Sequence, residues 1–131
     1  IGHRFESYTT HQVMFYLYIG IGAFLGAISR FFLSSYLEKL IFFEFPLGTL
    51  FVNIIGCYAI GIFIAINLEN KDLITPLVII GFLGSFTTFS AFTKEILLFS
   101  NLNGIYTAYF LTLLISSICV LSTFIGYKMF S

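Results

Sequence analysis

Three residues in an apolar stretch of the sequence have the spacing of one helical face. Thr49, Asn53 and Gly56 follow an i, i+4, i+7 pattern. The Asn53 amide offers two N–H donors and one acceptor oxygen, and Gly56 would leave space beside it. A polar amide at membrane depth either links neighbouring helices or directs a donor into a pore. The sequence leaves both roles open for Asn53.

A second unusual stretch is GFLGSFTTFSAFT at residues 81–93. Gly, Ser and Thr are poor helix formers, and their clustering predicts a break in the helix between Gly84 and Ser90. Unwound backbone at membrane depth persists only where protein or a cavity satisfies it. Freed carbonyl groups, such as those of Gly84 and Thr87, suit a small hard cation like Na⁺. A Ser/Thr kink without an ion is the alternative.

Phenylalanines recur every third residue in the same stretch, at Phe86, Phe89 and Phe92. Their rings would lie along one side of a continuous helix, where most such stripes are core or lipid contacts. Ring edges carry partial positive charge. Together with hydroxyl and amide donors from Ser90 and Asn53, they could replace the water around a small anion. A fixed cation would hold that anion too tightly for rapid passage.

The first apolar stretch contains a GxxxG pair and a cation. Gly22 and Gly26 would let two backbones approach closely, either between two chains or within one. Arg30 follows one helical turn later. It would either extend to the membrane interface or attract anions to a vestibule.

Helices that cross a membrane must position all these residues. Of the 131 residues 59% are hydrophobic and 9% charged, against about 25% charged in a typical soluble domain. Four apolar stretches, at residues 13–36, 46–68, 73–100 and 104–130, are long enough to span a bilayer. We therefore expect an all-α integral membrane protein, with a polar N-terminal segment (1–12) and one four-helix transmembrane channel domain (13–131).

The cationic side chains give little preference for one orientation in the membrane. One side would carry Arg4, Lys71 and Lys128; the other would carry Lys39, with Arg30 and Lys94 near its helix ends. Either the chain has one weakly biased topology, or it inserts both ways and forms an antiparallel dimer. A single unit of this size is small for a pore, so a second copy would have to supply a wall.

Other classes of function have little support. The net charge of zero gives nucleic acid no basic surface to bind, and no nucleophile–base pair indicates an enzyme. Cys57 and Cys119 lack a CxxC partner or a nearby His, so we expect small core residues rather than a zinc or redox site. A small multidrug-type proton-coupled exporter needs a membrane-embedded carboxylate, and only Glu95 lies away from loops and span ends.

Three segments resemble the CrcB/Fluc fluoride channels: GAFLGAISR at 22–30, GTLFVNIIG at 48–56 and GFLGSFTTFSAF at 81–92. They occur in the family's order, one in each of the first three spans. The resemblance covers nearly the whole chain after the first dozen residues. The last two motifs together are specific, whereas a lone GxxxR would be weak. Ser85 and Phe86 depart from the small or aliphatic residues of many relatives.

The resemblance implies a passive, fluoride-selective channel that exports fluoride across a bacterial plasma (inner) membrane. It implies a dual-topology, antiparallel homodimer with two pores in the lipid bilayer. A central structural Na⁺ would be bound by the backbone carbonyls of Gly84 and Thr87. Because both the Asn and the TTF motifs are present, a homodimer is favoured over a heterodimer of two similar chains.

The resemblance also assigns roles to individual residues by motif position. Arg30 matches the vestibule arginine. The pore residues that it implies are Thr49, Asn53, Phe89, Ser90 and Phe92, with a looser match for Tyr109, Thr112 and Ser116 in the fourth span.

Overall fold

The computed structural model describes residues 2–39, 41–42, 45–66 and 73–131, and within them the side chains of all but 2–8, 41–42 and 46. Lys71 and the Arg4 side chain therefore lie outside the described part. The elements in chain order are α1 (Gly2–Leu37), β1 (Ile41–Phe42), β2 (Phe45–Pro46), α2 (Gly48–Ala65), the π-helix η2 (Thr75–Leu83), α3 (Gly84–Phe86), α4 (Phe89–Asn103) and α5 (Ile105–Phe130).

Four helical stretches of the described chain are long and apolar enough to cross a membrane: Thr9–Leu37, Gly48–Ala65, Thr75–Asn103 and Ile105–Phe130. This confirms the expected four-span, all-helical architecture. The second span begins at Gly48 rather than at Pro46, because Phe45–Pro46 pair with Ile41–Phe42 in a short antiparallel ribbon. The polar residues 2–12 continue the first span as one helix.

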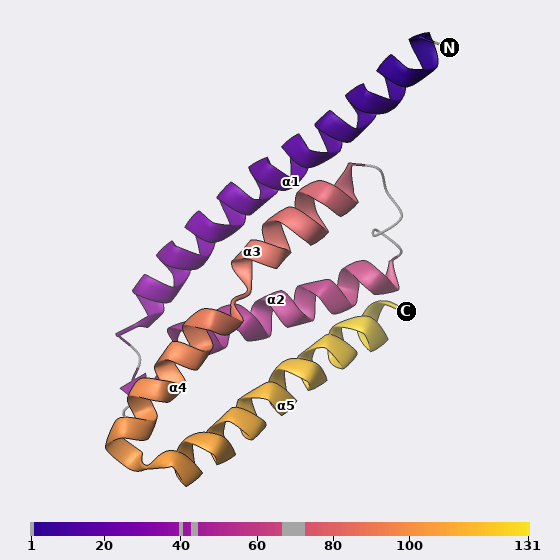
Figure 1. Cartoon of the computed structure of the whole chain (residues 1–131). Helices are drawn as coiled ribbons and strands as arrows, with labels where there is room; N and C mark the ends of the chain where they lie inside the picture. The colour runs from indigo at the N-terminus through magenta and orange to yellow at the C-terminus, as the bar shows by residue number, and fades with distance from the viewer. Residues whose placement is uncertain (1, 40, 43–44, 67–72) are drawn as a thin grey trace.

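Successive spans run in opposite directions, so both chain termini lie at one end of the molecule (Figure 1). α2 and α5 lie side by side and run the same way. The two helices approach so closely that a Cβ atom on Gly61 or Gly126 would overlap a backbone carbonyl of the facing helix. Glycine has no Cβ atom, and this permits the close contact. The Ser122 hydroxyl donates to the Ile54 carbonyl oxygen across this contact, at 3.1 Å.

The GxxxG pair of α1 packs inside the chain, against η2. A Cβ atom on Gly22 would overlap the carbonyl oxygen of Leu77, and one on Gly26 would overlap that of Phe82. The glycines therefore bring the first and third spans together within one subunit, which decides between the two roles that the sequence left open.

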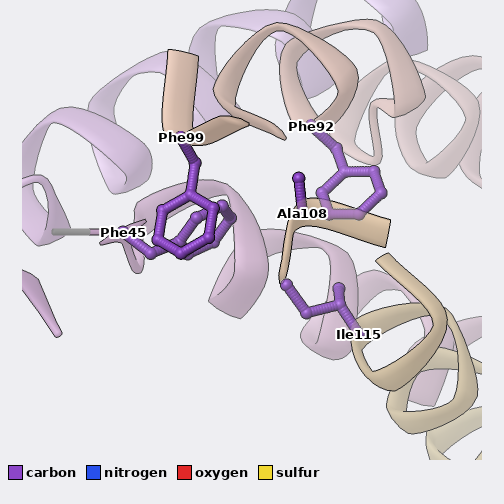
Figure 2. Close-up of a cluster of buried hydrophobic side chains, with 5 residues drawn as sticks. All are labelled: Phe45, Phe92, Phe99, Ala108 and Ile115. Carbon is purple, nitrogen blue, oxygen red and sulfur yellow. The ribbon is translucent and has the colours of Figure 1, made fainter. Parts of the chain in front are cut away.

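Five buried hydrophobic side chains join β2, α4 and α5 (Figure 2): Phe45, Phe92, Phe99, Ala108 and Ile115. The rings of Phe45 and Phe99 meet edge to face, with centroids 5.9 Å apart. This cluster fixes the second half of the third span against the fourth. It thereby sets the position of the residues that follow the helix break.

The third span is interrupted within the expected window. α3 ends at Phe86, and Thr87 and Thr88 are extended, with ψ angles of 147° and 124°. The Thr88 side chain accepts a hydrogen bond from the Ala91 N–H at 3.3 Å and so caps α4. Two threonines thus end one helix and start the next, and the third span is a bent pair of helices.

Candidate functional site

Asn53 bridges the break in the third span. Its Oδ1 accepts from the Thr88 N–H at 2.8 Å, and its Nδ2 donates to the Thr88 carbonyl oxygen at 3.0 Å. The extended backbone of Thr88 has left the helical hydrogen-bond pattern, so an amide with a donor and an acceptor is a suitable partner. Asn53 therefore links two helices, and the bond from Nδ2 uses only one of its two hydrogens.

The rest of the same face of α2 also lies on the third span. A Cβ atom on Gly56 would overlap the Thr87 side chain, so the space beside Asn53 is filled by that threonine. Thr87 Oγ1 donates to the Leu83 carbonyl oxygen at 2.9 Å. The i, i+4, i+7 face thus positions both extended threonines of the break.

Glu95 is a polar contact that the sequence analysis did not assign to the site. The Thr49 hydroxyl, in a residue only 5% exposed, donates to Glu95 Oε1 at 2.5 Å. Glu95 Oε2 is buried without a hydrogen-bond partner among the described atoms. Its position as the one carboxylate away from loops and span ends was the signal that could have identified it.

A cavity of about 210 Å³ lies where α2, the break, α4 and α5 meet. Its lining residues are Asn53, Cys57, Thr87, Thr88, Phe89, Phe92, Ile115, Ser116 and Cys119. Four of these residues, Asn53, Phe89, Phe92 and Ser116, are pore residues expected from the sequence. Residues far apart in the chain therefore converge on one small space with amide, hydroxyl and aromatic walls.

The two cavity phenylalanines form a pair, and the third member of the expected stripe does not join them. Phe89 and Phe92 have ring centroids 5.9 Å apart at 51°. Phe89 is 71% exposed, whereas Phe92 is 3% exposed. Phe86 instead stacks on Phe82 at 5.6 Å. The stripe of three required a continuous helix, and the break between Phe86 and Phe89 redirects the chain.

The other expected pore residues lie outside the lining of this cavity. Thr49 is buried against Glu95. Ser90 is exposed, and its hydroxyl lies 3.1 Å from that of Thr88. Tyr109 is 67% exposed on α5, and Thr112 donates to the Ala108 carbonyl oxygen at 2.8 Å. A pathway that includes them would extend beyond the cavity along α4 and α5.

Arg30 contacts the break from α1. Its Nε donates to the Ser85 carbonyl oxygen at 3.2 Å. That carbonyl would bond to the Phe89 N–H in a continuous helix, and the extended threonines remove this partner. The guanidinium group therefore lies beside the interruption, where a backbone carbonyl oxygen accepts its hydrogen bond.

The carbonyl groups at the break suit a hard cation. In a continuous helix the Thr88 N–H would bond to the Gly84 carbonyl oxygen, but here it donates to Asn53. Gly84 is exposed on the surface of the chain. No group of three or more His, Cys, Asp or Glu side chains among the described residues could hold a metal ion. Backbone carbonyl oxygens such as those of Gly84 and Thr87 are of the ligand type that suits Na⁺ rather than a transition metal.

Comparison with known proteins matches most of the chain to the family that its sequence motifs resemble. The family model described as CrcB-like protein, Camphor Resistance (CrcB), matches residues 17–127. A fluoride-specific ion channel FluC from Campylobacter lari is 43% identical over 121 residues, covering 87% of this chain and 95% of its own. Proteins with the same name from Nitratiruptor sp. and Campylobacter jejuni are 38% and 35% identical, over 80% and 87% of this chain and 82% and 95% of theirs. The chain therefore belongs to the CrcB-like family.

Proposed function

We propose that this protein is a fluoride-selective channel, which conducts the ion passively across a bacterial inner membrane and so exports it from the cytoplasm. The relatives carry the name fluoride-specific ion channel, and the chain is a multi-pass membrane protein of that family rather than an enzyme. The observation that carries the proposal is the cavity in which Asn53, Phe89, Phe92 and Ser116 converge.

The walls of this cavity suit an anion that is strongly hydrated in water. Leaving water costs such an ion many kcal/mol unless new donors replace its hydration shell. The second Nδ2 hydrogen of Asn53, the Ser116 hydroxyl and the ring edges of Phe89 and Phe92 supply neutral partners. No Lys or Arg side chain of the described residues lines the cavity, so the ion would be bound weakly enough to leave.

We propose that two inverted copies form the conducting unit, with two pores. Phe89 belongs to the cavity wall yet is 71% exposed in the single chain, and the facing surface of a second copy would complete the path there. Gly84 and Thr87 of each copy would offer two carbonyl oxygens to a central Na⁺. The positive charge of this ion would stabilise the partial negative charges of the freed carbonyl oxygens where the two copies meet.

Efflux from liposomes tests the proposed function. Purified protein is reconstituted into vesicles loaded with fluoride or chloride, and the release of each ion is followed with a selective electrode. We expect rapid fluoride release and chloride release no faster than from empty vesicles. Fluoride release at the empty-vesicle rate, or equal release of both ions, would contradict the proposal.

The embedded Glu95 favours one competing function, that of a proton-coupled exporter of small cationic drugs. A carboxylate hydrogen-bonded to Thr49 at this depth is the type of group that such an exporter protonates. The two functions differ in their driving force. A channel releases fluoride at the same rate with or without a pH gradient when the membrane voltage is held fixed. An exporter would require the gradient and would move an organic cation.

A further inference from the structure

The structure brings together the only two cysteines of the chain, which the sequence predicts to be small core residues. Cys57 is on α2 and Cys119 is on α5, and both line the cavity that holds Asn53 and Phe92. Each is partly exposed and neither is in a disulfide. Two thiols in one small cavity are a ligand set that a single cysteine could not provide.

The packing of α2 against α5 holds the two thiols side by side. The hydrogen bond from Ser122 to Ile54 lies three residues from each cysteine, and the glycine contact at Gly126 lies one turn beyond it. The Cys57 and Cys119 side chains both line the cavity between these helices. Because the helix backbones approach closely on either side of the two cysteines, the fold keeps both side chains at the same cavity.

Sulfur ligands select soft cations, and the number of ligands selects the coordination geometry. Zinc prefers four ligands, and no cluster of three or more His, Cys, Asp or Glu exists in the part of the chain that the structure describes. Two thiolates suffice for a soft cation that binds in a line between two sulfurs. A divalent ion would form a neutral complex with them, which suits the apolar neighbours Phe92 and Ile115.

We propose that Cys57 and Cys119 form a two-thiol site for a soft divalent cation such as Hg²⁺, and that occupancy of this site blocks the ion path through the cavity. Both S–H bonds break, two metal–sulfur bonds form, and two protons are released to water without any change in oxidation state. The bound ion would lie one helical turn from Asn53, on the same face of α2. The blocking effect rests on the proposed channel function, whereas binding of the metal does not.

The test combines fluoride efflux with intact mass measurement on the reconstituted full chain, titrated with HgCl₂. Wild type should bind one mercury per chain with the loss of two hydrogens and of both free thiols. The rate of fluoride efflux should fall at least about tenfold, a factor that corresponds to a free-energy difference of roughly 1.4 kcal/mol. Excess dithiol should remove the mercury and restore the efflux. The C57S/C119S variant should bind none, and its efflux should not change relative to its own mercury-free rate.

The single variants C57S and C119S separate a paired site from two independent thiols. Each should bind mercury through one sulfur with a chloride cap and should release it to a lower concentration of competing thiol than wild type does. Two mercury ions per wild-type chain, or equal retention in single variants and wild type, would overturn the proposal. Inhibition with a loss of two hydrogens but no added mercury would indicate a disulfide instead. A lack of fluoride efflux before mercury is added would contradict the channel function alone, because the intact mass still measures how much mercury the two cysteines bind.

Discussion

Asn53 shows how one side chain can serve both the fold and the ion path. Its oxygen and one amide hydrogen are bonded to Thr88, and the same residue lines the cavity. The sequence presented these two roles as alternatives. The structure indicates that removing the amide also leaves the Thr88 backbone without its partner at the break.

The first prediction therefore concerns both stability and flux in Asn53→Ala. Loss of the two bonds to Thr88 should lower the free energy of unfolding by about 1–3 kcal/mol, because a partly buried N–H is left unpaired. Fluoride efflux should fall about tenfold or more, since one lost donor of roughly 1.4 kcal/mol corresponds to that factor. Thermal unfolding in detergent and liposome efflux measure the two effects. Ile55→Ala on the same helix is the matched control: the Ile55 side chain is 47% exposed, and this variant should keep its fluoride efflux.

Phe89 allows the aromatic contribution to be separated from packing. Because its side chain is 71% exposed, Phe89→Ile should change the free energy of unfolding by less than about 1 kcal/mol. Fluoride efflux should nevertheless fall severalfold, because an aliphatic group has no positive ring edge to face an anion. Phe110→Ile is the control, since Phe110 is 69% exposed on α5 and does not line the cavity. Equal efflux from both variants would show that Phe89 only contacts lipid.

The sequence predicted site residues that belong to a recognisable motif, but it did not predict contacts between residues on different spans. Asn53, Phe89 and Phe92 were expected at the site, and the structure places all three around one cavity. The contact between Thr49 and Glu95 was not anticipated, because it joins residues on different spans whose register the sequence does not give. The pairing of Cys57 with Cys119 was missed for the same reason.

At the scale of elements, the break in the third span depends on partners outside that span. Ser and Thr clustering predicted where the helix would end. The stability of the break comes from Asn53 on α2, Arg30 on α1 and the cap on α4 provided by Thr88. The π-helix η2 before the break was not anticipated, since nothing in its apolar composition distinguishes a wider helical turn from an ordinary one.

Close packing of α1 on η2 leads to a prediction about helix contacts. Gly22→Ala should destabilise the protein by about 1–3 kcal/mol, because the added methyl group overlaps the backbone carbonyl of Leu77 and the helices must separate. Gly20→Ala is the control, since nothing lies within 4 Å of its added Cβ. It should be neutral or slightly stabilising. Size-exclusion profiles and melting temperatures in detergent compare the two, and an equally stable Gly22→Ala would contradict the observed packing.

At the scale of the whole molecule, alternating spans leave charged groups at both ends. Figure 1 shows the two chain termini at one end and the junction of α4 with α5 at the other. Lys128 lies near the first end, and Lys39 follows α1 at the second. Four spans could be predicted from hydrophobic length alone. Their pairing, α1 with η2 and α2 with α5, required the glycine contacts.

The balance of charge between the two ends makes orientation adjustable, and the proposed inverted dimer then becomes testable. N101K/L102K adds two cations at the α4–α5 end, whereas F130K/S131K adds two at the opposite end. Each should favour one orientation by the positive-inside preference. If the channel needs both orientations, either variant alone should confer little fluoride export on cells, and coexpression should restore it. The neutral variant N101Q/L102Q should export normally. Full export by each charged variant alone would mean that chains facing the same way conduct.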